Sequence, residues 1–168
     1  MSCLLRRPVR PTYRFSPALC LASFGLLSTL CVTLPARASS ADEAIPPPEV
    51  IAQLEQRASQ ADPREQAFLY TELVHTMTAK AGKEISDGET EEAAATLKKV
   101  NIYAHLIHVN LARDTKRLKN AEMLMHNTTY RLGQYLHLVS GDDKATVQDT
   151  LKQLDQVNDE ILSQVFSH

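Results

Sequence analysis

Apolar side chains recur in alternating steps of four and three between Gly88 and Val139. This spacing draws one stripe along a helix, because seven residues complete two turns at a period of 3.5 residues. No proline lies between the two ends, and Gly133 is the only internal glycine. Twelve of the fourteen positions suit an apolar seam, whereas Asp114 and Thr128 do not. The seam consists of Ala93, Leu97, Val100, Ala104, Ile107, Leu111, Asp114, Leu118, Ala121, Met125, Thr128, Leu132, Tyr135 and Val139.

The seam is compatible with one helix over residues 89–139 or with two helices that meet at a turn near residue 114. A single helix of about 50 residues would be about 75 Å long. We prefer the continuous helix, because the phase runs through Asp114 without a slip and a loop would usually reset it. The turn is favoured by Asp114 itself, which is polar, can cap a helix and lies at the midpoint.

Three shorter helices are predicted around this segment, at residues 48–60, 63–83 and 143–166. Asp62-Pro63-Arg64-Glu65 indicates a helix start, with Asp62 as the cap and Pro63 at the first helical position. No stretch alternates with period two, so no strand is predicted. Short turns at 86–88 and 140–142 make the neighbouring helices antiparallel. The predicted fold is all-α, an antiparallel helical bundle built on a long heptad-patterned central helix (89–139), with a split near 114 as the alternative.

The two alternatives differ in how they treat a second apolar stripe, Ile102, Leu106 and Val109. Half-length partners on one long helix would leave this stripe partly uncovered, and such a surface favours self-association. A closed four-helix bundle can bury it within one chain. A homodimer is therefore one possible assembly.

Residues 1–38 have the pattern of a secretory signal peptide. Arg6, Arg7, Arg10 and Arg14 precede an uncharged apolar run from residue 18 to residue 34, and Ala36-Arg37-Ala38 has the small-x-small form of a cleavage site. The run of 17 residues is short for a membrane span, so no stable membrane anchor is expected after cleavage. Residues 39–47 form a flexible, proline-containing linker, and residues 48–168 form the helical bundle. The protein is predicted to be exported, to the periplasm or out of the cell.

Export changes the chemistry that remains. Cys3, Cys20 and Cys31 all lie in the predicted signal, so the mature chain has no thiol for a disulfide or a zinc–thiolate site. Loss of five arginines leaves 13 basic and 20 acidic side chains, a formal net charge of −7. An acidic domain without tryptophan is a poor candidate for binding nucleic acid or anionic lipid.

Histidines provide the candidate metal ligands. His105 and His108 lie three residues apart on one helix face, which is a workable spacing for two ligands, but no further ligand is evident. Glu72-Leu73-Val74-His75 resembles half of a di-iron site, which needs this element twice. Met and His can hold a haem between them, and Met123 and His126 share a helix face, but the last helix offers no second axial residue before His168. No cofactor is predicted.

A basic band, Arg113, Lys116, Arg117 and Lys119, stands out in this acidic chain. Such a band is usually a solvated helix face, and it is otherwise a docking patch for an acidic partner. No serine lies in a nucleophile-elbow setting, so an enzyme is not expected. We expect an exported, non-enzymatic helical interaction or structural protein with an unknown protein partner. The alternative is a metal- or haem-binding helical bundle outside the cytoplasm.

Overall fold

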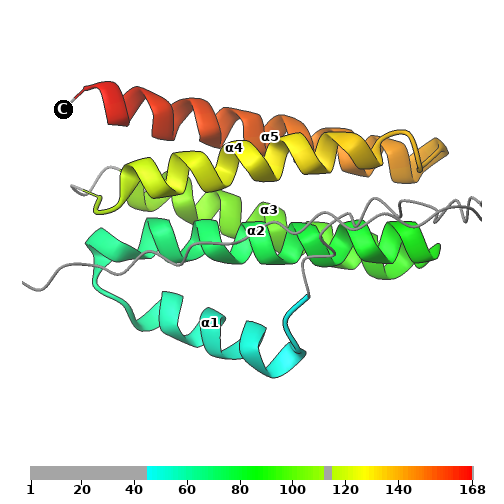
Figure 1. Cartoon of the computed structure of the whole chain (residues 1–168), viewed down its shortest axis with the longest axis horizontal. Coiled ribbons are helices and arrows are strands. Elements are labelled where there is room, and N and C mark those ends of the chain that lie inside the picture. The colour runs from blue at the N-terminus through cyan, green and yellow to red at the C-terminus, as the bar shows by residue number, and fades with distance from the viewer. Residues whose placement is uncertain (1–44, 112–114, 168) are drawn as a thin grey trace, which may run out of the picture. The chain divides into compact units, whose positions relative to one another are not determined.

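The computed structural model describes residues 45–111 and 115–167, all within the unit Ser40–His168. The described residues form five helices and no strand (Figure 1). The all-helical fold class is therefore confirmed. The helices are α1 (Pro48–Gln60), α2 (Pro63–Asp87), α3 (Thr90–Leu111), α4 (Leu118–Tyr135) and α5 (Gly141–Phe166).

Helices α2 to α5 make a four-helix bundle from two antiparallel hairpins, α2–α3 and α4–α5. Helix α2 also packs against α4, and α3 against α5, so that α3 and α4 are diagonal to one another (Figure 1). Contacts between the hairpins show that these neighbours run parallel. Along α2, His75 lies 2.8 Å from Thr128 and, further on, Gly82 lies against Tyr135 of α4. Along α3, Asn101 donates to Thr150 at 3.2 Å and, further on, His108 contacts Glu160 of α5 at 2.6 Å. The C-terminus of α3 and the N-terminus of α4 therefore lie at the same end of the bundle.

The ends of α2 follow from local sequence. The Asp62 carboxylate accepts from the Arg64 backbone N–H at 2.9 Å, and Pro63 occupies the first helical turn, as predicted. Gly88 closes the helix in the left-handed conformation at φ 82°, where a side chain would be strained. The predicted end near residue 83 is too early, because Gly82 lies within the helix. A Cβ at Gly82 would overlap the ring of Tyr135 from α4.

The preferred continuous helix over 89–139 is wrong, because α3 ends at Leu111 and α4 begins at Leu118. The Thr115 hydroxyl lies 3.3 Å from the carbonyl oxygens of both Asn110 and Leu111, at the C-terminus of α3. The backbone N–H of Lys116 donates to the carbonyl of Arg64 at 2.8 Å, and this bond attaches the turn to the start of α2. Asp114, the expected cap, lies outside the described residues.

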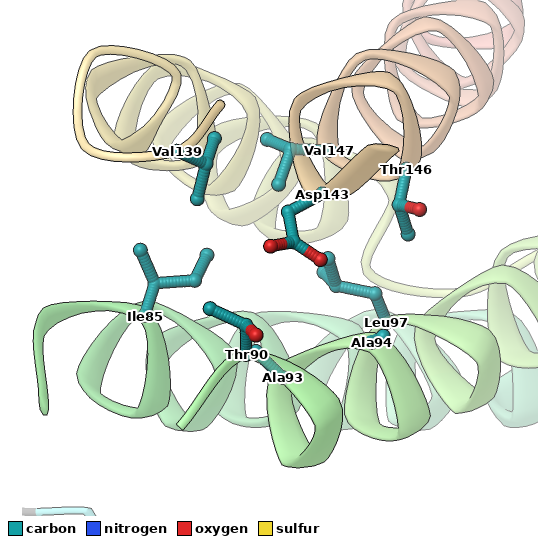
Figure 2. Close-up of a pocket in the computed structure, with 9 residues that line it drawn as sticks. All are labelled: Ile85, Thr90, Ala93, Ala94, Leu97, Val139, Asp143, Thr146 and Val147. Atoms are coloured by element: carbon teal, nitrogen blue, oxygen red, sulfur yellow. The ribbon is translucent and has the colours of Figure 1, made fainter. Parts of the chain in front are cut away.

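The seam nevertheless identifies the core. All seam members on α3 are buried. The seam members on α4 are also buried, except for Leu118 and Tyr135 at its two ends, which are half-buried. Val139, in the turn before α5, is also half-buried. At the end of the bundle nearest that turn, the side chains of α2, α3 and α5 close over a pocket of only about 10 Å³, room for about one water (Figure 2).

Helix α1 lies outside the four-helix bundle and packs mainly on α2. Ile51 and Ala58 supply its buried apolar contacts. Two polar contacts add to them. The Tyr103 hydroxyl of α3 donates to Glu55 Oε1 at 2.6 Å, and Arg57 pairs with Glu72 of α2 at 2.9 Å. Within the described ranges, no helix is both long enough and apolar enough to cross a membrane.

Candidate functional site

A wide, open hollow on the described surface runs between α4 and α5, and we call it the α4–α5 groove. Its open volume is about 760 Å³. Gly133 lines it and has no side chain where α5 comes near. A Cβ built there would meet Leu151 Cδ2 at 3.9 Å, which is ordinary contact. The groove is lined by His126, Thr129, Tyr130, Gly133, Gln134, His137, Leu151, Asp155 and Asn158.

The α5 wall of the groove carries acceptors that lack donors. Burial, and secondly the charge of Asp159, raise the pKa of the Asp155 carboxyl above its usual value. Within the described residues neither carboxylate forms an ion pair. The side-chain oxygen of Asn158 is buried, and no group in the described ranges donates to it. A buried acceptor without a donor is unfavourable in the free protein by about 1–3 kcal/mol.

Apolar side chains continue the groove at one end. Leu151, Asp155, Asn158, Leu162 and Phe166 follow one another in steps of four, three, four and four, so they share one stripe of α5. Phe166 is 80% exposed although it is a large aromatic residue. Across the groove, Tyr130 is 67% exposed. The result is a polar centre with apolar groups beside it, an arrangement suited to binding another chain.

The predicted metal pair His105 and His108 is on the outer side of α3. Their rings stack with centroids 6.1 Å apart, and His108 Nδ1 lies 2.6 Å from Glu160 Oε2 of α5. In the part of the chain that the structure describes, no three His, Cys, Asp or Glu side chains converge on a point where a metal ion could sit. The geometry therefore places His108 in contact with Glu160.

The other candidate metal or haem ligands lie in different parts of the structure and do not form one site in the described residues. Glu72 pairs with Arg57, and His75 lies against Thr128, so these two residues serve contacts between helices. Met125 is in the core, whereas Met123 is 61% exposed. His126 lines the α4–α5 groove.

The residues of the predicted basic band differ in what they contact. Lys116 lies 3.2 Å from Glu65, and the guanidinium of Arg117 sits 3.6 Å from the centroid of the Phe68 ring. These contacts hold the turn before α4 against α2, which leaves less of the basic band for docking. Lys119 is exposed on the first turn of α4, and Arg113 lies outside the described residues.

The second apolar stripe on α3 is not covered by the bundle. Ile102 is 60% exposed and Val109 is 48% exposed, while Leu106 is half-buried. Helix α1 reaches α3 beside this stripe, at Tyr103, and does not bury it. The stripe remains a candidate contact surface between copies of the chain.

A further hollow, of about 290 Å³, lies between α1, α2 and α3. The buried carboxylate of Glu84 lines it, with one oxygen that has no donor within the described residues. Its other oxygen pairs with Lys80, which also donates to Thr96 at 3.1 Å. This charge is therefore matched by the chain itself, unlike those of Asp155 and Asp159.

The α4–α5 groove was not predicted from the sequence. Its members come from two helices and alternate with seam residues, so each helix alone shows only a polar flank. The sequence feature that could have indicated the groove is the stripe on α5. There, Leu162 and Phe166 follow Asp155 and Asn158 on a helix face that is separate from the predicted seam.

Comparison of the chain with protein-family models, with curated proteins and with solved structures gives no match.

Proposed function

We propose that this chain is an exported helical interaction protein that binds a protein partner through the α4–α5 groove. The observation that carries the proposal is the groove itself. An open surface hollow of about 760 Å³ combines unpaired polar groups with the exposed side chain of Tyr130. Surfaces of this composition are typical of protein interfaces, which favour aromatic residues at their centre.

Export is part of the proposal and has its support in residues 1–38, which lie outside the described residues. The arginine-rich start, the uncharged apolar run and Ala36-Arg37-Ala38 support cleavage after Ala38. A bundle whose core is filled by its own side chains can persist outside the cytoplasm without disulfides, because burial of apolar surface alone stabilises a domain of about 120 residues.

Site-specific photo-crosslinking tests the interaction. A benzophenone amino acid at Tyr130 should give a discrete adduct with another protein in cells of the native host. The same group at Lys98, which is exposed on α3, is the matched control and should give none. Identical adducts at both positions, or none at Tyr130, would contradict a specific interface at the groove. An adduct of twice the chain mass would identify a second copy as the partner.

A further inference from the structure

The α4–α5 groove has the dimensions of a site for one helix. On its α4 wall, His126, Tyr130 and Gly133 follow one another in steps of four and three, and so lie on one stripe, and His137 lines the groove from the turn after α4. The seven steps from His126 to Gly133 span about 10 Å of helix, or about two turns. A helix laid in such a groove contacts it through side chains at spacings of three and four. Leu151 of α5 comes close to Gly133 of α4 at one end of this length.

The carboxylates on the α5 side of the groove favour a ligand that carries positive charge. Asp155 and Asp159 are one turn apart on α5, and like charges at this spacing destabilise a helix. Lys152 precedes Asp155 by three residues but forms no ion pair with it in the described part of the chain. A donor cation in the groove would give the exposed Asp155 carboxylate a partner.

The opposite wall offers an aromatic face to the same cation. Tyr130 lines the groove together with Asp155, and its ring is largely exposed. A lysine or arginine beside a tyrosine ring gains a cation–π contact in addition to its carboxylate partner. Beyond Asn158, Leu162 and Phe166 extend the stripe with apolar side chains, so the ligand also needs an apolar face.

We propose that the α4–α5 groove binds a basic amphipathic helix of a partner protein, with a lysine or arginine seated between Asp155 and the ring of Tyr130. The proposal rests on the proposed function, because it names the chemistry of the partner at the same groove. The mature chain, at a formal charge of −7, would also attract such a partner at long range.

The test measures fluorescence anisotropy with two labelled helical peptides, one built from Leu, Ala and Lys and its twin with every Lys replaced by Glu. The protein is produced from the full coding sequence, and the salt is about 0.15 M, where the Debye length is about 8 Å, to suppress non-specific attraction. Asp155→Asn removes the charge without changing shape. Asp149→Asn makes the same change on the exposed side of α5 outside the groove and is the control. Gly133→Met fills the groove from a position where a Cβ fits.

The Lys peptide should bind saturably and the Glu twin should not. Asp155→Asn should weaken binding of the Lys peptide by about fivefold or more, as expected for the loss of a charged contact of about 1 kcal/mol. Gly133→Met should weaken this binding further, and Asp149→Asn should change the affinity less than about twofold. Circular dichroism during thermal unfolding checks that each variant keeps its fold.

Several outcomes would overturn the proposal, and they separate it from the proposed function. If both peptides bind alike and Gly133→Met weakens both, the groove is an interface but the basic partner is wrong. If Asp149→Asn weakens binding as much as Asp155→Asn, the attraction is general and the seated cation is wrong. If Gly133→Met changes neither affinity, both proposals fail. A wild-type dimer by light scattering that Gly133→Met converts to a monomer would make a second copy the occupant.

Discussion

Gly82 provides the sharpest test of how α2 packs on α4. Whether Gly82→Ala raises or lowers the free energy of unfolding should depend on Tyr135, 53 positions away. An alanine in place of a glycine within a helix normally stabilises by about 1 kcal/mol. Here the new methyl group would overlap the half-buried ring of Tyr135, which must move out. An aromatic side chain buries about 150–250 Å² when fully covered, so half of that is about 100 Å², or about 2 kcal/mol at 25 cal/mol per Å².

Gly82→Ala should therefore destabilise the wild type by about 1 kcal/mol, as the difference between these two terms. In a Tyr135→Ala background the clash is absent, and the same substitution should stabilise by about 1 kcal/mol. The coupling between the two sites is then about 2 kcal/mol, well above the error of a double-mutant cycle. Urea denaturation of the four proteins, with a common m-value, measures it.

The control is the other glycine inside a helix, Gly133. Its Cβ would make only an ordinary contact with Leu151, so Gly133→Ala should stabilise by about 1 kcal/mol in both backgrounds. The packing described for α2 and α4 would be refuted if Gly82→Ala stabilised the wild type and the Tyr135→Ala variant equally.

Three further predictions concern export, the core and α1. Mass spectrometry of the protein from its host should find a mature N-terminus at or near Ser39, and an intact chain in the membrane fraction would mean an uncleaved anchor. Leu97→Ala should cost about 2–5 kcal/mol and Lys98→Ala less than about 0.5 kcal/mol in chemical denaturation, and equal costs would place the core elsewhere. Burial, and then the hydrogen bond to Glu55, raise the pKa of Tyr103 above its usual value, so its contribution is complete below about pH 10 and is lost as the pH rises further. Wild-type stability should thus fall more steeply above pH 10 than that of Tyr103→Phe, and parallel curves in alkaline urea titrations would contradict this.

The sequence was most informative where a helix end depends on residues next to it. The Asp62-Pro63 start and the bounds of α1 were predicted as they occur, because a cap and a proline act within one turn. The end of α2 was predicted near residue 83 and lies at Asp87, because Gly82 is a position of close approach to Tyr135 and does not break the helix. The α4–α5 groove was missed for the same reason, since Gly133 and Leu151 meet only after α5 folds back on α4.

The error over the central segment has a specific geometric cause. Leu111 and Leu118 are seven residues apart, which is two turns of the seam, so the apolar phase is the same on either side of the turn. A turn of six residues between diagonal helices can therefore preserve the phase as well as a continuous helix can. The density of apolar residues is the better signal. Between Leu97 and Val139, residues 112–117 are the longest run without a large apolar side chain, and four of the six are charged.

That run is also where the chain depends on tertiary contacts. Lys116 bonds to the backbone of Arg64, and Arg117 adopts φ 62° with its guanidinium over Phe68. Positive φ is uncommon for a residue with a side chain, and it persists where surrounding contacts stabilise it. The basic residues that resembled a docking patch are therefore, at Lys116 and Arg117, part of the structure that reverses the chain. The α4–α5 groove differs from this turn, because Asp155 lines it without an ion-pair partner in the described residues.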